Sequence, residues 1–519
     1  MMQKITSAFS QPLSSVTGTR EMERFAAASL PPHALMQRAG LSVARLTLAL
    51  APHANCIWIA CGPGNNGGDG FEAAMHLHQL GKQVALTWTG PPSGKALPPD
   101  AQASRQRALA AGVTITAQPP EDFDFCIDAL LGLGAILDME RAGSAQMTQW
   151  LDVMHASGKP LLCIDLPTGL HADTGQSSYP ATATNAIKSI AATAHKTGVS
   201  GIFTLSLLTL KPGLFTASGR DRAGEIWFDN LGVHAEAVAP APGIWLLGND
   251  RAATASRAKT LQASHKGSFG DVAVLGGEAT AGSHMAGAAL LAGRGALHAG
   301  AGRVYVALTG NAEAALKVDI AQPELMFRSP EALDLKRQVI VCGCGGGGAI
   351  SQWLPRVLSV APRLVLDADA LNAIAGDSGL QTLLAARQGR GYSTVLTPHP
   401  LEAARLAGIS AAAVQADRLQ TAASLAQRFG CVLVLKGSGT IIAAPGQPLM
   451  LNASGNALLA TAGTGDVLAG MVGAYLAGGM TAFDAACSAV FVHGNLADQW
   501  LRESPQCVLT ASRLAMQAG

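Results

Sequence analysis

The most constraining feature of this sequence is the alternation of short apolar runs with longer segments of helical periodicity. In the first half the strand-like runs are residues 56–60, 84–88, 125–130 and 161–165, and they end at glycine turns or acidic residues. In the second half they are residues 272–275, 303–308, 339–342, 364–366, 394–396 and 431–435. Strands that alternate with helices predict parallel sheets covered by helices on both faces. We therefore expect an α/β fold.

Two further features divide the chain. Apolar residues recur at helical spacing over residues 19–50, and Pro31 and Pro32 interrupt them, which predicts two helices before the first strand. The segment 235–242 is rich in Ala and Pro and lacks periodicity, as linkers do. At about 150 residues per domain, 519 residues permit two large domains. We place them at residues 1–240 and 241–519.

Composition excludes several classes of function. The 36 basic and 35 acidic residues leave a net charge of +1, so binding to nucleic acid or to a membrane surface is not expected. The 59 glycines and only 5% aromatic residues suit glycine turns at nucleotide sites better than stacking platforms. Nine cysteines without a CxxC pair, and no signal or membrane-spanning segment, predict a cytoplasmic protein. The low charged fraction of 14% suggests a homo-oligomer.

A glycine-rich string follows the first predicted strand, over residues 61–70, and a helix is expected from Phe71 to Leu80. A glycine turn between strand and helix lets backbone amides approach a phosphate, so a nucleotide or dinucleotide fits there. A tight structural turn is the alternative for any glycine loop. Asn65, Asn66 and Asp69 favour a site, because a turn does not require these polar groups.

Two later strands of the first half end in acids, Asp128 and Asp165. The carboxyl ends of parallel strands meet at one crevice, where Asn66, Asp128 and Thr168 could offer oxygen atoms to a hard cation while Asp165 faces the ligand. A single acid at a strand end is often only a helix cap. The combination of these residues favours a site.

The second half contains the string Gly463 to Asp466 before an apolar helix expected from Val467. Glycine amides at a helix N-terminus can hold a transferring phosphoryl group, and Asp466 in the first turn suits a general base for a hydroxyl. An acidic helix start after a flexible turn is the alternative. The string as a whole favours catalysis.

Other strand ends of the second half carry polar groups. Residues 436–440, Lys-Gly-Ser-Gly-Thr, form a second phosphate-type loop that could hold a nucleotide donor, although it is not a Walker sequence. Asp367 and Asp369 follow another strand, and His399 follows the next. His399 alone is equally consistent with a structural residue. Together these groups are expected at one crevice.

These residues resemble a known family. The shared motifs of the first half are residues 35–40, 64–70, 128–134, 165–174 and 210–214, and those of the second are 265–267, 367–372, 397–400, 436–440 and 463–466. They are similar to motifs of the bifunctional NAD(P)H-hydrate repair enzymes, and the resemblance covers nearly the whole chain. It implies a Rossmann-like three-layer epimerase domain followed by a ribokinase-like α/β dehydratase domain.

The resemblance implies two activities. The epimerase would interconvert the R and S forms of NADH hydrate and NADPH hydrate. The dehydratase would convert the S form back to NAD(P)H and would consume ADP or ATP. When ADP is the donor, the other products would be AMP and phosphate. The implied ligands are potassium in the epimerase, magnesium, the two hydrates and the nucleotide. Asp466 would take the hydroxyl proton of the hydrate as it attacks the terminal phosphoryl group, and elimination of phosphate would follow.

The resemblance also assigns residues by matching position. The epimerase hydrate-binding residues would be Asn65, Asn66, Gly67, Gly68, Asp69, Gly132, Leu133, Gly134, Ala135, Ile136, Leu137, Asp138 and Asp165, with Asp165 as acid and base. The potassium ligands would be Asn66, Asp128 and Thr168. The dehydratase hydrate contacts would be Ala281, Gly347, His399 and Asp466. The nucleotide site would be Lys436, Gly437, Ser438, Gly439, Thr440 and Gly465.

The sequence departs from the family pattern at a few positions. Thr168 replaces the usual Ser and keeps its hydroxyl, residues 343–347 lack the usual proline, and Ala462 replaces a glycine. Residues 177–208 form a longer connection than expected. Two alternatives stay open: a ribokinase-like small-molecule kinase, and a dehydratase whose N-terminal domain only binds.

Overall fold

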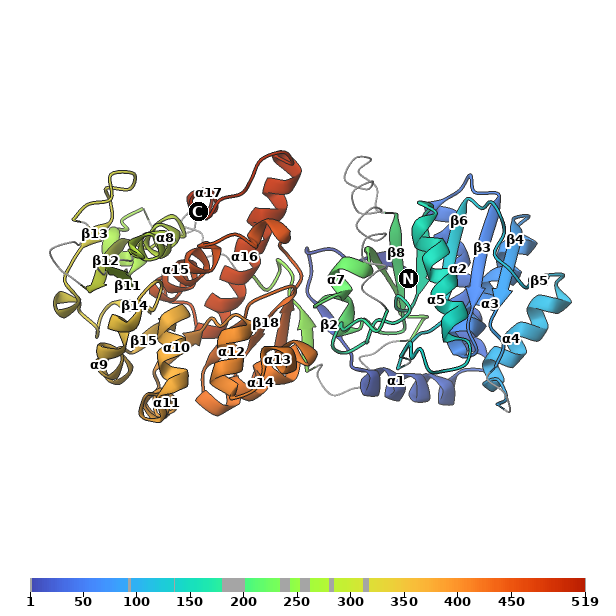
Figure 1. Ribbon diagram of the computed structural model, residues 1–519, viewed down its shortest axis with the longest axis horizontal. Coiled ribbons are helices and arrows are strands. Elements are labelled where there is room, and N and C mark those ends of the chain that lie inside the picture. Colours follow the sequence, from blue (N-terminus) through green and yellow to red (C-terminus); the bar gives the residue numbers. More distant parts are fainter. Residues whose placement is uncertain are drawn as a thin grey trace. The chain divides into compact units, whose positions relative to one another are not determined.

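The computed structural model describes residues 2–91, 95–134, 136–179, 201–233, 243–252, 262–279, 284–310 and 317–518. The chain forms two compact units, Met1–Thr6 with Pro12–Ile244 and Ser7–Gln11 with Trp245–Gly519. Each unit contains one mostly parallel sheet with helices packed on it (Figure 1). The α/β fold class predicted from the sequence is confirmed.

The first unit begins with the two predicted helices, α1 (Val16–Ser29) and α2 (Ala34–Leu50), separated at Pro31 and Pro32. Its eight-stranded sheet has the order β1 (Gln3–Lys4), β9 (Glu225–Asp229), β8 (Ile202–Leu207), β7 (Leu161–Ile164), β6 (Phe125–Ala129), β3 (Cys56–Cys61), β4 (Gln83–Trp88) and β5 (Ile115–Thr116). All neighbours are parallel except β1, which runs antiparallel to β9. The strand order reverses at β3, between β4 and β6, and such a switch point forms a ligand crevice at the carboxyl ends.

The sheet of the first unit is covered on both faces. Ile57 and Ile59 of β3 belong to the apolar cluster that α2 and α3 (Asn65–Gln79) complete. Trp58 and Ala60 point the other way and pack with residues of α5 (Ser144–Ala156). The other α-helices in the described part of this unit are α4 (Pro99–Ala110) and α7 (Gly219–Arg222). Alternate residues of one buried strand therefore join two helical layers, which is the predicted three-layer arrangement.

Two predicted helix starts were wrong. Helix α3 begins at Asn65 rather than Phe71. The glycines that were predicted to form a loop lie within the helix, where they permit close packing. A Cβ atom at Gly67 would lie 2.1 Å from the Gly62 carbonyl oxygen. In the second unit, the helix predicted from Val467 begins at Thr464.

The second unit has an eleven-stranded sheet. Its order is β13 (Met326–Phe327), β12 (Arg303–Gly310), β11 (Asp271–Ala279), β14 (Val339–Cys342), β15 (Arg363–Leu366), β16 (Ser393–Leu396), β17 (Val432–Leu435), β18 (Thr440–Ala443), β19 (Leu449–Asn452), β10 (Ile244–Leu246) and β2 (Gln11–Leu13). The strands from β13 to β17 are parallel, whereas β18 is antiparallel to β17 and β19. The central parallel strands are buried along their length.

Helices cover both faces of this second sheet (Figure 1). One layer consists of α8 (Ala286–His298), α15 (Thr464–Ala477), α16 (Ala482–Glu503) and α17 (Ala511–Met516). The other consists of α9 (Leu354–Val360), α10 (Ala368–Gly376), α11 (Ser378–Ala385), α12 (Pro400–Ala407), α13 (Ala411–Ala416) and α14 (Arg418–Phe429). Val272, Val341 and Val467 share one large apolar cluster, so α15 lies on the centre of the sheet.

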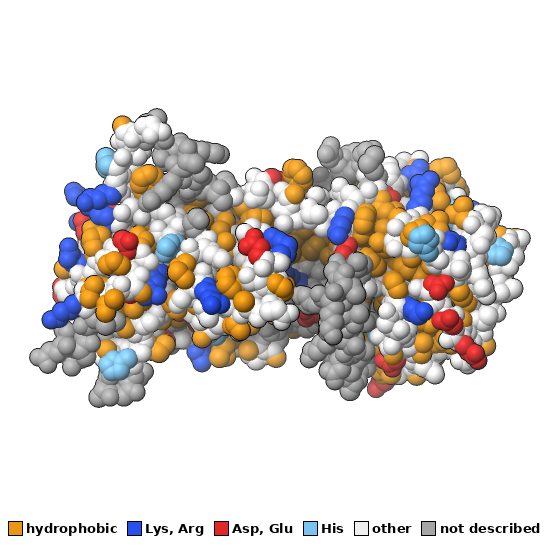
Figure 2. Space-filling model, turned by 90° about the horizontal axis from the view of Figure 1, so that it is seen from above, with side chains coloured by type: hydrophobic (Ala, Val, Ile, Leu, Met, Phe, Trp, Pro, Cys, Tyr) orange, Lys and Arg blue, Asp and Glu red, His pale blue; other side chains and the backbone are white. Residues whose placement is uncertain are grey.

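Acidic and basic side chains are interspersed with apolar ones on the face that Figure 2 shows. This distribution agrees with the net charge of +1. None of the described helices has the length and apolarity needed to span a bilayer.

The contact between α8 and α15 provides a test of the packing. A Cβ atom at Gly470 would lie 2.0 Å from the Ala292 carbonyl oxygen, so Gly470→Ala should destabilise the second unit by about 2 kcal/mol. Gly287 in α8 has no atom within 4 Å of its Cβ position, so Gly287→Ala should leave stability unchanged or raise it by about 0.5 kcal/mol. Denaturant midpoints of the two variants would measure the difference. Equal midpoints would contradict this packing.

Candidate active sites

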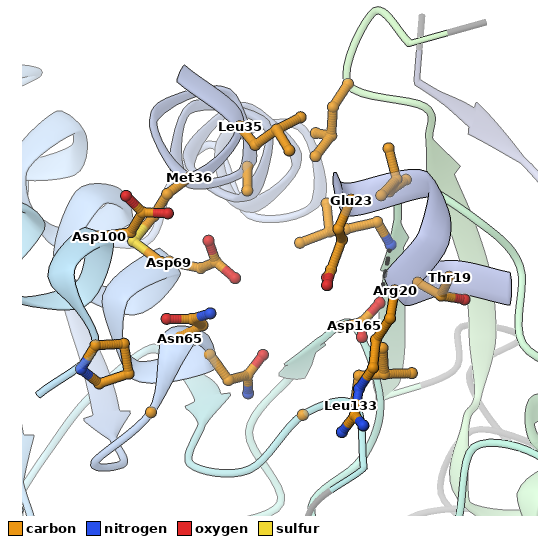
Figure 3. A pocket seen from close by; sticks show the side chains of 18 of the residues that line it. Thr19, Arg20, Glu23, Leu35, Met36, Asn65, Asp69, Asp100, Leu133 and Asp165 are labelled. Carbon is orange, nitrogen blue, oxygen red and sulfur yellow. Dashed lines mark hydrogen bonds between the residues drawn. The ribbon is translucent and has the colours of Figure 1, made fainter. Parts of the chain in front are cut away.

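The first candidate site is a cavity of about 430 Å³ in the first unit. It lies at the carboxyl ends of β3, β6 and β7, and α1, α2 and α3 contribute to its wall. Figure 3 shows Asn65 and Asp69 on one side of the cavity, and Arg20, Glu23 and Asp165 on the other. The cavity is therefore lined by charged groups from elements far apart in the sequence.

Asp165 follows β7 in an unusual backbone conformation, with a φ of 64°. A left-handed non-glycine residue costs on the order of 1 kcal/mol, and such strain is frequent at functional sites. Its carboxylate accepts a hydrogen bond from the backbone NH of Leu207 (3.1 Å) and forms an ion pair with Lys211. The Lys211 side chain is 1% exposed and also donates to the Leu207 carbonyl oxygen at 2.7 Å. These contacts hold the Asp165 carboxylate at the cavity wall.

The pKa values of two other carboxyl groups of the cavity are raised. Burial raises the pKa of Asp69 well above its ordinary value, and the charges of Asp165 and Glu23 raise it further. Desolvation also raises the pKa of Glu23, and Asp165 adds to this effect. The cavity thus combines one ion-paired carboxylate with carboxyl groups that retain a proton more readily.

The three predicted potassium ligands lie on connected segments. Thr168 donates to Asp128 from its backbone NH (2.9 Å) and its hydroxyl (2.7 Å), and its Oγ1 accepts from the NH of Leu131 at 2.9 Å. The next residue, Gly132, packs against Asn66, because a Cβ there would lie 2.9 Å from Asn66 Oδ1. Two observations bear on a cation. Asn66 Nδ2 is buried and has no hydrogen-bond partner among the described residues, but it is a donor, so only Asn66 Oδ1 could face a cation.

The second observation concerns Asp128. Burial raises the pKa of its carboxyl even though Thr168 and Leu130 donate hydrogen bonds to it. A cation nearby would stabilise the ionised form. Carboxylate, hydroxyl and amide oxygens are the donors that hard cations prefer. The residues present therefore fit potassium.

The other residues predicted for the epimerase site are distributed unevenly. Asn65, Asn66, Asp69, Gly132, Leu133 and Asp165 line the cavity. Gly67 and Gly68 are buried within α3, and Gly134, Ile136, Leu137 and Asp138 line a neighbouring hollow instead. Ala135 lies outside the described residues.

Several cavity residues were missed by sequence reasoning. Arg20 and Glu23 come from α1, which carries no recognised motif, and Leu35 and Met36 come from α2. Lys211 belongs to a motif that contributed to the resemblance but received no role. A basic residue that follows a buried strand and precedes Pro-Gly was the signal that could have identified it.

The second candidate site lies at the carboxyl ends of the neighbouring strands β14, β15, β16 and β17. Lys436, which follows β17, contacts Asp367, which follows β15, with 2.7 Å between Nζ and Oδ1. The Thr397 hydroxyl donates to the same oxygen at 2.8 Å. Cys344 Sγ, Asp367 and Asp466 offer atoms that all lie within 4.8 Å of one another. Four separate segments therefore converge on one buried carboxylate.

Asp466 lies in the first turn of α15, directly after the predicted glycines. Burial, followed by the charge of Asp367, raises the pKa of Asp466 to about 7. Gly465 brings the helix start close to Lys436, because a Cβ there would lie 3.2 Å from Nζ. A carboxyl that titrates near neutral pH suits a general base.

The loop from Lys436 to Thr440 is held by hydrogen bonds from a buried arginine, Arg418. Arg418 Nη2 donates to the carbonyl oxygens of Leu435 (3.4 Å), Lys436 (3.3 Å) and Gly439 (3.1 Å). Gly437 and Gly439 have φ values of 136° and 69°, which permit this turn. These contacts fix the shape of the loop, and the Lys436 backbone NH donates to the Pro398 carbonyl oxygen at 2.9 Å. Sequence reasoning missed Arg418 because it lies in a separate helix, α14.

The remaining predicted dehydratase residues surround this centre. The Gly347 NH donates to Asp369 Oδ2 at 2.9 Å. His399 Nδ1 accepts from the backbone NH groups of Leu401 (3.1 Å) and Glu402 (3.3 Å), so it caps α12 while about half of its side chain stays exposed. The structural role considered for His399 is thus present. Ala281 lies outside the described residues.

Another buried histidine was missed. His493 of α16 hydrogen-bonds the Thr464 carbonyl oxygen at 2.9 Å. Burial lowers the pKa of His493 to about 4, so its imidazole is neutral at physiological pH. A neutral ring that donates to Thr464 steadies the start of α15 without adding charge next to Asp466.

Only two of the three clustered side chains, Asp367 and Asp466, carry oxygen atoms that magnesium could bind. Of these, Asp367 is already ion-paired with Lys436. Burial raises the pKa of the Cys344 thiol well above its ordinary value, and magnesium prefers oxygen ligands. Magnesium in such sites is held by one or two carboxylates together with substrate phosphates. The residues present fit that arrangement.

Comparisons with known proteins cover both units. Residues 32–211 match the family described as YjeF-related protein N-terminus, and residues 272–517 match NAD(P)H-hydrate dehydratase. The chain is 35% identical over 485 residues to the bifunctional NAD(P)H-hydrate repair enzyme Nnr of Escherichia coli (strain K12). The matched region covers 89% of this chain and 84% of that protein. This chain belongs to the bifunctional NAD(P)H-hydrate repair enzyme family.

Further proteins are similar to all or part of the chain. The repair enzyme Nnr of Coxiella burnetii is 32% identical over 507 residues, covering 95% of this chain and 96% of that protein. The ADP-dependent (S)-NAD(P)H-hydrate dehydratase of Neisseria meningitidis serogroup B is 41% identical over 242 residues, covering 45% of this chain and 78% of that protein. A solved ADP/ATP-dependent NAD(P)H-hydrate dehydratase from Bacillus subtilis, co-crystallised with ATP and Mg²⁺, is 30% identical with a TM-score of 0.42, covering 50% of this chain and 91% of that one.

The environment of Asp466 predicts an effect on stability. The unfolded chain loses this proton near pH 3.8 and the folded chain near pH 7, so wild-type stability falls as pH rises between these values and is then constant. The full shift corresponds to about 4 kcal/mol, which solvent at this half-buried position reduces to on the order of 2 kcal/mol. Asp466→Asn should therefore melt at a higher temperature than the wild type at pH 8, with a smaller gain at pH 5. A gain that does not depend on pH would contradict the shift.

Proposed function

We propose that this chain repairs hydrated NADH and NADPH in two steps, with the epimerase in residues 1–240 and the dehydratase in residues 241–519. Family membership over nearly the full length, at 35% identity to a bifunctional enzyme, is the observation that carries the proposal. The cavity of the first unit and the carboxylate cluster of the second support it, because each reaction requires its own acid–base site.

The dehydratase reaction uses the position of Asp466. Its carboxylate accepts the hydroxyl proton of the S hydrate while the hydroxyl oxygen attacks the terminal phosphoryl group of ADP, which releases AMP. Phosphate then leaves more readily than hydroxide, and the nicotinamide double bond is restored. Lys436, Gly437, Ser438, Gly439, Thr440 and Gly465 hold the donor, a role supported by the glycine turn after Lys436 and by the start of α15, where Gly465 lies close to Lys436 Nζ. Asp367, together with the phosphates, would hold magnesium, which would offset negative charge on the phosphates.

Hydrate binding to this unit involves Gly347, His399 and Asp466. The Gly347 turn packs closely against Glu278, since a Cβ there would lie 1.9 Å from Glu278 Oε2. The His399 ring is about half exposed, and its Nε2 lies 3.2 Å from Glu402 Oε1, so a ligand would contact the exposed part of the ring. Ala281 completes the proposed set by resemblance alone.

The epimerase reaction takes place in the cavity of the first unit, where Asp165 exchanges protons with the hydrate. Asn65, Asp69 and the segment from Gly132 to Asp138 bind the dinucleotide. Asn66, Asp128 and Thr168 would hold potassium through their oxygen atoms, and the burial that raises the pKa of Asp128 supports that role, because a nearby cation would favour the ionised carboxylate. Epimerisation that persists unchanged when sodium or tetramethylammonium replaces potassium would contradict this assignment.

We also propose a cytoplasmic homo-oligomer, supported by the low charged fraction of 14%. A monomer in light scattering at working concentration would contradict the oligomer.

Two single variants separate the proposed activities. Asp466→Asn should lower dehydration of the S hydrate by about 10²- to 10⁴-fold and leave epimerisation intact, because it removes a base from one site only. Asp165→Asn should do the reverse. Chromatography that resolves the R hydrate, the S hydrate and NADH measures both reactions in one sample. Each variant serves as the control for the other, and parallel loss of both activities in either variant would contradict the two-site proposal.

A further inference from the structure

We propose that Glu23 is a second catalytic residue of the epimerase, acting as the acid that protonates the ring nitrogen while Asp165 accepts the hydroxyl proton. This inference rests on the proposed epimerase function and specifies how that site works. It also gives a role to α1, which lies outside the residues 32–211 that match the epimerase family.

The position of Glu23 follows from the packing of α1. Thr19, Met22 and Ala26 are the buried residues of this helix, so Glu23 lies beside its buried face and reaches the cavity. The Thr19 hydroxyl hydrogen-bonds the Thr209 hydroxyl at 2.7 Å, two residues before Lys211. Helix α1 is therefore fixed against the segment that carries the lysine partner of Asp165.

Glu23 and Asp165 lie on the same side of the cavity. Figure 3 shows both there, whereas Asn65 and Asp69 line the opposite side. Among the charged groups that act on Glu23, Asp165 has the largest effect, and Lys211 and Arg20 oppose it. A bound ring can thus meet an acid and a base from one direction.

The surroundings of the two carboxyls assign their roles. The ion pair with the buried Lys211 holds the Asp165 carboxylate at the cavity wall, where it acts as the proton acceptor. Glu23 has no such ion pair among the described residues, and desolvation and Asp165 raise its pKa. Neighbouring acids whose environments differ in this way divide into one base and one acid.

The substrate chemistry requires such a pair. The hydrate carries its hydroxyl on the ring carbon bonded to the ring nitrogen, so this carbon is a hemiaminal centre. Asp165 takes the hydroxyl proton, and the electrons of the O–H bond form a carbonyl. The electrons of the carbon–nitrogen bond pass to the nitrogen, which takes the proton of Glu23. The ring opens to an aldehyde and an N–H group.

Inversion then needs only a rotation. Turning about the neighbouring carbon–carbon bond presents the other face of the aldehyde to the nitrogen. The nitrogen attacks, its proton returns to Glu23, and the new hydroxyl takes the proton from Asp165. Both carboxyls end as they began, and no water, oxidant or reductant is consumed. Asp69, on the opposite side, is less suited, because the oxygen and nitrogen that exchange protons are bonded to the same carbon.

The test compares Glu23→Gln with Glu21→Gln in the full-length protein. Glu21 and Glu23 are both exposed residues of the same helix, but only Glu23 lines the cavity, so Glu21 is a matched control. Starting from pure R hydrate, Glu23→Gln should lower the rate of inversion by about 10²- to 10⁴-fold, with dehydration of the S hydrate unchanged. Glu21→Gln should match the wild type, and Glu23→Asp should retain part of the activity.

Two further measurements define the role of Glu23. In the wild type, inversion should slow as pH rises through the raised pKa of Glu23, because the acid loses its proton, and this dependence should disappear in Glu23→Gln. In ¹⁸O-labelled water, the inverted product should keep the oxygen of the substrate during early turnover.

Three outcomes would overturn the proposal. Wild-type inversion rates in Glu23→Gln would remove Glu23 from the chemistry, while leaving the epimerase function in place. One solvent oxygen incorporated per inversion would indicate loss and return of water instead of ring opening. Absence of inversion in the wild type, with S-hydrate dehydration intact, would overturn the epimerase function and this inference together.

Discussion

The structure depends on a constraint that both units share, the burial of a lysine–carboxylate pair at the carboxyl edge of a parallel sheet. Helices cover both faces of such a sheet, so the strand ends are where polar groups can meet a ligand. Asp165 pairs with Lys211 in one unit, and Asp367 pairs with Lys436 in the other. Buried charges are costly unless they are paired, so each pair fixes the loops around it. The two sites are built on the same principle.

Each pair also changes the chemistry of a neighbouring carboxyl group. Burial and the charge of Asp367 bring the pKa of Asp466 to about 7. In the first unit, desolvation and the charge of Asp165 raise the pKa of Glu23. An acid whose proton is held near neutral pH can both give and take it during a reaction. The same arrangement can therefore support a phosphoryl-transfer base in one unit and an acid–base pair in the other.

The sequence predicted the parallel sheets, because buried strands and amphipathic helices have distinct periodicities. It also located Asp165, Lys436 and Asp466, since glycine strings at strand ends signal close backbone approach. It did not predict the contribution of α1 or Arg418, because their roles depend on packing between segments distant in the chain. The start of α3 was predicted too far along the chain, because glycine has a low helix propensity. In the structure, glycine is required within this helix because its backbone lies in close contact with Gly62. Local pattern thus identified the strand ends, and only tertiary packing identified their partners.

The most direct test of the account follows the absorbance of reduced nicotinamide. A mixture of R and S NADH hydrate would be incubated with the wild-type chain, ADP, magnesium and potassium. Two cooperating sites predict complete recovery of NADH, because the epimerase supplies the S form as the dehydratase consumes it. Recovery that stops when the initial S form is exhausted would contradict an active epimerase, and no recovery with either ADP or ATP would contradict the repair function itself.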